Sequence, residues 1–302
     1  MSFENIIGNI KIKKYLTQSI EDKNFLHSYL FLGTEGIGKL IFAKEFAKYI
    51  LCRESKMNEC NCKSCLCFDS NNHPDFSVIN EEGETIKVEF IRNVIDKIIE
   101  KPIVSDRKVY IINDCEKMTK EAQNCLLKTL EEPPKFVTII LVSSNENLIL
   151  YTIKSRCTSI KFNNIEKDEL RKYIEKNLEY DNLTENLLRF FDGSIGKAIK
   201  IQEKKEKFLE IEKIIKNVKQ KDFIDFMQDT KVLYDKENIF DFLDYIIVCL
   251  YEQSCNDKRF LNCITYVNEC ITRLKSNAYL DMNVDVLLFN IWEEVNENSY
   301  RS

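Results

Sequence analysis

Four apolar, β-branched runs punctuate the first half of the chain. They read SYLFLG, KVYIIND, FVTIILVSS and SIKF, at residues 28–33, 108–114, 136–144 and 159–162. None of them alternates between apolar and polar positions, which is typical of strands buried on both faces of a parallel sheet. Helical periodicity fills the segments between them, at residues 39–51, 86–100 and 120–132. The pattern predicts a doubly wound α/β domain with a parallel sheet.

The β pattern stops at about residue 163, and lysine, glutamate and isoleucine then recur at helical spacing. We expect a small helical unit at 164–205, which contains the turn GSIGK, and a larger all-helical unit at 206–302. The most apolar helix of the larger unit is expected at 239–253. With the α/β domain at 1–163, the predicted organisation has three parts.

Composition indicates a globular protein outside the membrane. Of 302 residues, 44% are hydrophobic, enough for sizeable cores. No apolar run approaches the roughly 18–20 residues that span a bilayer. The first residues mix charges with apolar side chains instead of forming a signal peptide, so we expect a cytoplasmic protein. The net charge of −5 comes from 44 basic and 49 acidic residues mixed along the chain, which argues against strong independent binding to nucleic acid.

The segment GTEGIGKL has the glycine spacing of a phosphate-binding loop between a strand and a helix. Gly33, Gly36 and Gly38 permit a tight turn whose N–H groups face phosphates, and Lys39 would reach the outer phosphates. The next position normally carries the Ser or Thr hydroxyl that holds Mg²⁺, but Leu40 offers no oxygen. We therefore expect magnesium-dependent hydrolysis to be badly impaired even if a nucleotide binds.

A second departure from the pattern of active nucleotide hydrolases lies at the end of the strand KVYIIND. Nucleotide hydrolases of this type place an Asp for magnesium and a Glu for the attacking water there. This chain has Asn113 and Asp114, an amide and a shortened acid. Alternatively, Asp114 merely caps the next helix or lies at the surface. Loop and strand both point to lost hydrolysis chemistry.

Five of the twelve cysteines fall between residues 52 and 67. The chain is large and shows no export signal, so metal ligation explains them better than disulfides. Cys52, Cys60, Cys62 and Cys65 supply four thiolates, the set that structural Zn²⁺ favours. Because Cys60 and Cys62 are spaced more tightly than C-x-x-C, Cys67 is a spare candidate for Cys60. A redox C-x-x-C pair is the alternative, whereas four thiolates leave catalytic zinc no position for water.

The other seven cysteines lie in apolar or helical stretches and are expected to be buried thiols.

The segment TIKSRC ends a helical turn just before the last predicted strand. Its arginine, Arg156, is either an ordinary surface charge or a group that reaches a neighbouring chain's nucleotide and stabilises charge on the transferring phosphoryl group.

Several segments together resemble the bacterial clamp-loader subunits of the AAA+ class. They are HSYLFLGTEGIGK, the cysteine cluster, NHPDF, KVYIINDCEKMTKEAQNCLLKTLEEPP and IKSRC. The resemblance is strongest over about residues 1–200, and its most specific pieces are LLKTLEEPP (126–134) and SRC (155–157). It implies an AAA+ (P-loop NTPase-like) module that carries zinc, a helical lid and an oligomerising helical collar. It also implies that Arg156 is an arginine finger acting in trans.

Within that family, the departures resemble subunits that keep the fold without the ATPase. Besides Leu40 and the Asn113–Asp114 pair, Gly196 takes the place of an arginine that senses nucleotide in active subunits, with Lys197 beside it. ATP and Mg²⁺ are therefore not expected to be bound productively. The implied partners are gamma/tau and delta clamp-loader subunits, and through them the sliding clamp and primer–template DNA.

The resemblance also implies structural Zn²⁺. The family's zinc cysteines correspond directly to Cys52, Cys62 and Cys65, and to Cys60 only after a one-residue deletion. We favour a catalytically silent clamp-loader subunit over an active gamma/tau-type ATPase, in which another group or water would hold the magnesium. A metal-dependent or redox enzyme that uses the cysteines is a third hypothesis.

Overall fold

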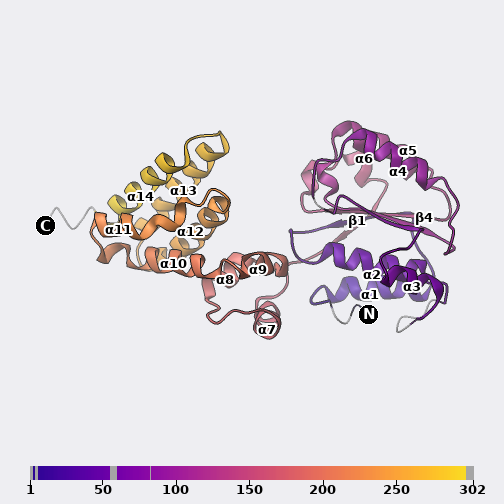
Figure 1. Ribbon diagram of the computed structural model, residues 1–302, viewed down its shortest axis with the longest axis horizontal. Helices are drawn as coiled ribbons and strands as arrows, with labels where there is room; N and C mark the ends of the chain where they lie inside the picture. Colours follow the sequence, from indigo (N-terminus) through magenta and orange to yellow (C-terminus); the bar gives the residue numbers. More distant parts are fainter. Residues whose placement is uncertain (1–2, 4–5, 55–59, 82, 297–302) are drawn as a thin grey trace. The chain divides into compact units, whose positions relative to one another are not determined.

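The computed structural model divides into two compact units (Figure 1). It describes residues 3, 6–54, 60–81 and 83–296. The first unit comprises residues 1–170 and 193–197, and the second comprises 171–192 and 198–302. The three-part division at 163 and 205 stays a prediction. No helix in the described ranges is long and apolar enough to cross a membrane.

The first unit is built on a parallel sheet, as predicted, and this sheet has five strands. Its order is β2–β3–β4–β1–β5, and the strands are β1 (Ser28–Leu32), β2 (Phe76–Ile79), β3 (Lys108–Ile112), β4 (Val137–Ser143) and β5 (Thr158–Lys161). Every residue of β1, β3 and β4 is buried. The four predicted strands are present, and β2 is an additional half-buried edge strand.

Helices cover both faces of the sheet (Figure 1). One face carries α1 (Ile10–Glu21), α2 (Lys39–Leu51) and α3 (Lys63–Asp69), and the other carries α4 (Val88–Ile98), α5 (Lys120–Glu131) and α6 (Tyr151–Lys154). Side chains alternate between faces along a strand. Tyr29 and Phe31 therefore join the core beneath α1 and α2, whereas Leu30 and Leu32 join the core beneath α4 and α5. The predicted doubly wound α/β architecture is confirmed.

The second unit is entirely helical in its described part, again as predicted. Two helices, α7 (Lys167–Asn177) and α9 (Ile195–Gln202), begin in the first unit and end in the second. The others are α8 (Glu185–Phe191), α10 (Lys205–Asn217), α11 (Phe223–Asp229), α12 (Ile239–Ser254), α13 (Arg259–Lys275) and α14 (Leu280–Asn296). The most apolar of the predicted helices is α12, which packs against α8, α10 and α13.

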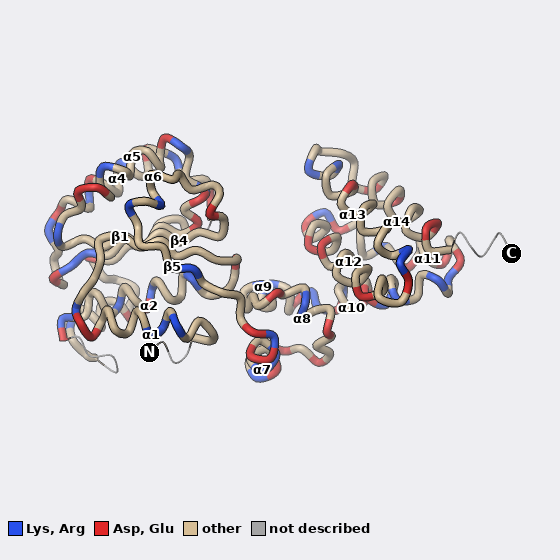
Figure 2. Tube along the Cα trace, turned by 180° about the vertical axis from the view of Figure 1, so that it is seen from behind, with Lys and Arg blue, Asp and Glu red and all other residues tan. Residues whose placement is uncertain are grey.

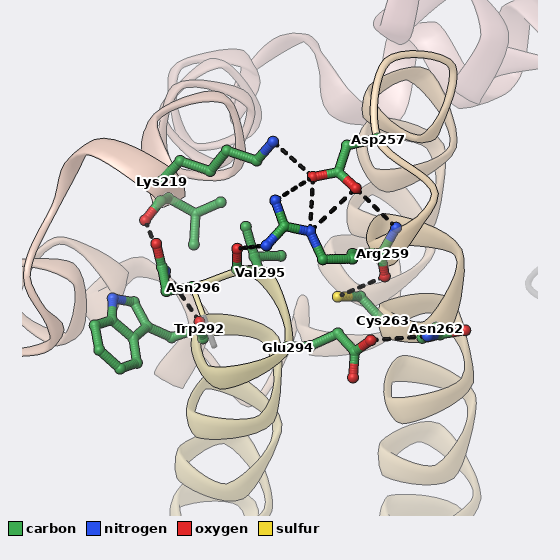
Figure 3. A network of polar contacts seen from close by, with 10 residues as sticks. Lys219, Asp257, Arg259, Asn262, Cys263, Trp292, Glu294, Val295 and Asn296 are labelled. Carbon is green, nitrogen blue, oxygen red and sulfur yellow. Dashed lines mark hydrogen bonds and ion pairs between the residues drawn. The ribbon is translucent and has the colours of Figure 1, made fainter. Parts of the chain in front are cut away.

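Two polar networks connect the helices of the second unit to one another. In the first, the buried Glu212 carboxylate of α10 accepts hydrogen bonds from Tyr245 Oη at 2.7 Å and Thr184 Oγ1 at 2.8 Å. In the second, Arg259 lies between the Asp257 carboxylate and the Val295 carbonyl, to which Nη1 donates at 2.6 Å (Figure 3). The second network joins the start of α13 to the end of α14.

Candidate functional site

The segment between β1 and α2 forms a glycine turn that leads into the helix. Gly38, the N-cap of α2, has φ 93°, a left-handed conformation that favours glycine. Lys39 Nζ donates to the carbonyls of Gly33 and Thr34, at 2.7 Å each. Burial lowers the pKa of Lys39, whose side chain folds back onto its own loop. Leu40 packs against the core that lies beneath α1 and α2.

The loop also contacts the turn GSIGK, which belongs to the same unit. The Gly196 N–H donates to the Gly36 carbonyl at 2.9 Å. A Cβ on Gly196 would lie 2.8 Å from Gly36 Cα, and a Cβ on Gly36 would lie 2.2 Å from Ser194 Oγ. Side chains do not tolerate such short contacts, so two glycines are needed here. A larger residue at position 196 would require the loop to move.

Asn113 and Asp114 follow β3 at the same carboxyl edge of the sheet. Asn113 exchanges hydrogen bonds of 3.3 Å with Asn80, each side-chain amide donating to the other residue's carbonyl. Asp114 has φ 46° and is the N-cap of a short 3₁₀ helix, although its side chain makes no capping bond. Its carboxylate lies 3.2 Å from Lys117 Nζ. In this structure, both side chains are engaged by neighbours at the rim of the sheet.

Glu116 is a further carboxylate at this edge, and its contacts were not predictable from its neighbours in the sequence. Its Oε1 accepts hydrogen bonds from the backbone and hydroxyl of Ser144, and its Oε2 is buried without a partner among the described residues. Burial raises the pKa of Glu116, but the bonds from Ser144 outweigh that effect and lower it. Among the charged groups around Lys39, the Glu116 carboxylate raises the pKa of Lys39 most, against the larger lowering by burial. Its position after β3, at the edge that carries the glycine loop, is the signal that could have identified it.

The cysteine cluster forms where α2 ends and α3 begins. The Sγ atoms of Cys52, Cys60, Cys62 and Cys65 all lie within 4.8 Å of one another. Zn–S bonds of about 2.3 Å place tetrahedral ligand sulfurs about 3.8 Å apart, so the four positions fit Zn²⁺. Burial raises the pKa of Cys62, but hydrogen bonds from Cys65 and Cys60 lower it to about 7. Cys67 is not in this group, and residues 55–59 of the predicted zinc segment lie outside the described residues.

A buried polar network anchors this segment to the sheet. The hydroxyls of Ser64 and Ser105 both donate to the Leu51 carbonyl at 2.8 Å, and both contact His73 Nε2. The Asp75 N–H donates to His73 Nδ1 at 3.0 Å, which assigns the ring proton to Nε2. Leu51 and Ser64 directly precede two of the four cysteines. The backbone around the cluster is therefore held by contacts that involve no metal.

Arg156 lies at the opposite edge of the sheet. It follows α6, and its carbonyl accepts a 2.7 Å hydrogen bond from Ser28 Oγ, at the first residue of β1. Gly33 follows the last residue of that strand. At about 3.3 Å per residue, the five residues of β1 put about 16 Å between the Arg156 backbone and the phosphate loop. The structure therefore separates Arg156 from the loop of its own chain.

The Arg156 side chain pairs with Glu131 at the end of α5. Nε donates to Glu131 Oε1 at 2.8 Å, and Nη2 contacts the same oxygen. Nη1 donates to the Thr152 carbonyl at 2.9 Å and to Ser155 Oγ at 3.3 Å. A cavity of about 310 Å³ lies beside the pair, and Pro133 also lines it. The segments LLKTLEEPP and SRC thus meet through this ion pair.

A family model described as DNA polymerase III, delta subunit, matches residues 8–166, more than half of the chain. The chain belongs to the clamp-loader family of DNA polymerase III. It is 30% identical to the DNA polymerase III subunit delta' of Bacillus subtilis over 237 residues, which cover 75% of this chain and 70% of that protein. It is 31% identical to the subunit tau/gamma of Haemophilus influenzae over 184 residues, 60% of this chain but 27% of that longer protein.

A solved structure supports the fold of this clamp-loader chain. It is a DNA polymerase III gamma subunit-related protein from Thermotoga maritima, with a TM-score of 0.53 at 19% identity. The alignment covers 94% of this chain and 99% of that one. The predicted AAA+ module followed by helical regions is therefore confirmed as the fold of this clamp-loader family member.

The predicted site residues of the clamp-loader chain fall at three separate places in the first unit. The glycine loop and Asn113 share the carboxyl edge of the sheet, the four cysteines gather beside α2 and α3, and Arg156 lies at the amino edge. The arrangement contains a phosphate-type turn, a candidate metal centre and a partly exposed arginine that is paired with Glu131.

Proposed function

We propose that this chain is a clamp-loader subunit of the delta-prime type. It acts as a catalytically silent AAA+ stator and presents Arg156, in trans, to the ATP site of a neighbouring gamma/tau subunit. The observation that carries the proposal is the position of Arg156 at the edge of the sheet opposite its own phosphate loop. An arginine placed there is too far from the phosphate loop of its own chain to serve it, so we infer that it serves a nucleotide held by another chain. There it would stabilise charge on the transferring phosphoryl group.

The environment of the loop supports catalytic silence. Leu40 and Asn113 occupy the positions from which oxygen ligands would hold Mg²⁺, and neither is a hydroxyl or a carboxylate. Lys39 donates to carbonyls of its own loop, and Gly196 packs on Gly36 where an arginine would be needed to sense nucleotide. We infer that the loop is retained as a fold element and that ATP and Mg²⁺ are not bound productively.

Zinc fits the proposed role as a structural ion. Four thiolates complete a tetrahedral shell, so Cys52, Cys60, Cys62 and Cys65 would hold Zn²⁺ without an open position for substrate or water. Bound there, the ion would join the end of α2 to the start of α3. A filled coordination shell disfavours a hydrolytic zinc enzyme. The cluster would instead stabilise the segment between the two helices.

The proposed partners are gamma/tau and delta clamp-loader subunits, and through them the sliding clamp and primer–template DNA. Relatives of the chain carry the names of DNA polymerase III subunits, which supports such an assembly. Positive and negative side chains are mixed over both units (Figure 2), and the net charge is −5. A surface of this kind favours contact with DNA through the partners over independent binding.

The test is Arg156→Ala in a clamp loader reconstituted with its partner subunits. The complex should still assemble, while DNA-stimulated ATP hydrolysis and clamp loading fall about tenfold or more, because arginine fingers contribute strongly to phosphoryl transfer. Arg156→Lys should recover only part of the rate, since lysine lacks the planar fork. Lys135→Ala, which removes an exposed cation near the same edge, is the control. Unchanged rates for Arg156→Ala would reject the proposal.

A second candidate is an active gamma/tau-type ATPase. The left-handed Gly36 and Gly38, the buried Lys39 and the nearby Glu116 are the observations in its favour. In that case a water molecule would take the place of the hydroxyl missing at position 40. The two candidates differ in whether the isolated chain hydrolyses ATP.

A further inference from the structure

The Glu131–Arg156 ion pair carries an inference that rests on the proposed function of Arg156. We propose that Glu131 is a positioning residue that holds the Arg156 guanidinium in a stored position. The γ-phosphate of the neighbouring chain's ATP must displace this carboxylate before the arginine can act. ADP has no γ-phosphate and leaves the pair intact. Glu131, on the same chain as Arg156, therefore determines when the guanidinium can bind the neighbour's nucleotide.

The hydrogen bonds of the guanidinium show why displacement is needed. Arginine has five N–H donors. Glu131 Oε1 receives one from Nε and one from Nη2, while Nη1 donates to the Thr152 carbonyl and Ser155 Oγ. Among the described residues, one N–H is left without an acceptor. Bidentate binding of a phosphate needs two parallel N–H groups. Glu131 must therefore release the N–H groups of Nε and Nη2 before a phosphate can bind them.

The backbone on both sides of the pair is fixed, which confines the exchange to side chains. Glu131 is the last residue of α5, and Ser28 Oγ holds the Arg156 carbonyl at 2.7 Å. The cavity beside the pair gives the guanidinium space to turn away from Glu131. A rotation of side-chain torsions is enough, and no helix has to move.

The exposure of the two side chains makes the pair weak enough to exchange. The Arg156 side chain is 33% exposed and the Glu131 side chain 47% exposed. Ion pairs that are open to solvent contribute little to stability. A terminal phosphate carries more negative charge than a carboxylate and attracts the guanidinium more strongly at the same distance. Glu131 therefore keeps Arg156 ordered without competing successfully against ATP.

Glu131→Gln in the reconstituted loader tests the inference. This variant keeps the shape of the side chain but removes its charge, so Arg156 becomes easier to recruit. We expect kcat/KM for DNA-stimulated ATP hydrolysis to rise about two- to fivefold, the equivalent of an exposed ion pair, while the inhibition constant of ADP stays unchanged. Glu131→Asp keeps the charge and should stay closer to the original protein. Glu132→Gln, at the exposed neighbouring position, is the matched control.

The double variant separates this inference from the arginine-finger proposal. In an Arg156→Ala background, Glu131→Gln should have no further effect. A normal rate for Arg156→Ala alone rejects the finger itself. A reduced rate for Arg156→Ala, together with an unchanged or reduced kcat/KM for Glu131→Gln, leaves the finger standing and overturns the stored position. Weaker ADP binding or failed assembly with Glu131→Gln would indicate a purely structural carboxylate and would also overturn it.

Discussion

Gly196 donates its backbone N–H to the carbonyl of Gly36, at 2.9 Å, and thereby joins the turn before α9 to the phosphate loop. The two backbones approach so closely that a Cβ on either residue meets its neighbours at 2.8 Å or less. An arginine that senses nucleotide would project from the position where this contact occurs. A side chain at position 196, such as the arginine expected there in active subunits, would therefore have to displace the loop.

Gly196→Ala should destabilise the first unit by about 1–3 kcal/mol, the usual cost of overpacking. Alanine forms helix better than glycine by about 1 kcal/mol, so without the contact the substitution at this position in α9 would be stabilising. The sign of the change in unfolding free energy therefore reports on the contact with Gly36. Ile199→Ala, at an exposed position of the same helix, should change stability little. A more stable Gly196→Ala protein would contradict the packing.

Cys62→Ser and Cys65→Ser should each abolish bound zinc and destabilise the first unit by more than about 3 kcal/mol, because loss of a metal is among the largest single-residue effects. Metal analysis of the purified proteins, together with thermal unfolding, measures both effects. Chelation of zinc from the unaltered chain should lower the unfolding temperature in the same way.

Two further variants decide the fourth ligand. Cys60→Ser should lose zinc, whereas Cys67→Ser should retain it, since Cys60 Sγ lies in the cluster and Cys67 does not. The reverse result would assign the fourth position to Cys67. Full metal content in both Cys62→Ser and Cys65→Ser would show that the ligand set is wrong.

The buried Glu212 carboxylate makes the stability of the second unit depend on pH. Burial raises the pKa of Glu212, but hydrogen bonds from Lys216, Tyr245 and Thr184 outweigh it and hold the pKa below the ordinary 4.5. The folded state therefore binds this proton less readily than the unfolded state. Its contribution is fully present above about pH 4.5 and is lost as the pH falls through the lowered value of the folded state.

This acid sensitivity can be measured with Trp292, the single tryptophan of the chain, which packs against Phe223 in the second unit. The unfolding free energy followed by its fluorescence should decrease between pH 5 and pH 3, and Glu212→Gln should flatten that dependence. Glu212→Ala should cost about 1–3 kcal/mol at neutral pH, because the buried Tyr245 hydroxyl loses its acceptor. An equally steep pH dependence in Glu212→Gln would assign the effect to other carboxylates.

Burial explains which elements were predictable. The strands β1, β3 and β4 are buried on both faces, so their apolar runs stand out in the sequence. The edge strand β2 is only half-buried and has four residues, so its FSVI run gives a weak signal. The helix α3 has seven residues, too few to show a helical pattern of apolar positions.

The candidate site residues were predictable where they lie close together in the sequence, and not where their partners lie far along the chain. Spacing along the chain predicted the four cysteines and the glycine loop, since those residues are close in sequence. Glu116 and Glu131 were missed because their roles depend on Ser144 and Arg156, which lie 28 and 25 residues further along the chain. The departure at Gly196 was recognised, but its packing on Gly36 arises from the tertiary fold.

The purified chain on its own should show no magnesium-dependent ATP turnover, even at concentrations at which very slow hydrolysis is detectable. Leu40 offers magnesium no oxygen, Asn113 offers a neutral amide in place of a carboxylate, and Lys39 is occupied by the carbonyls of Gly33 and Thr34. Lys39→Ala is the control, because trace activity from a contaminating ATPase would persist in that variant. Turnover that disappears with Lys39→Ala would show a working loop and assign the chain to the active gamma/tau type.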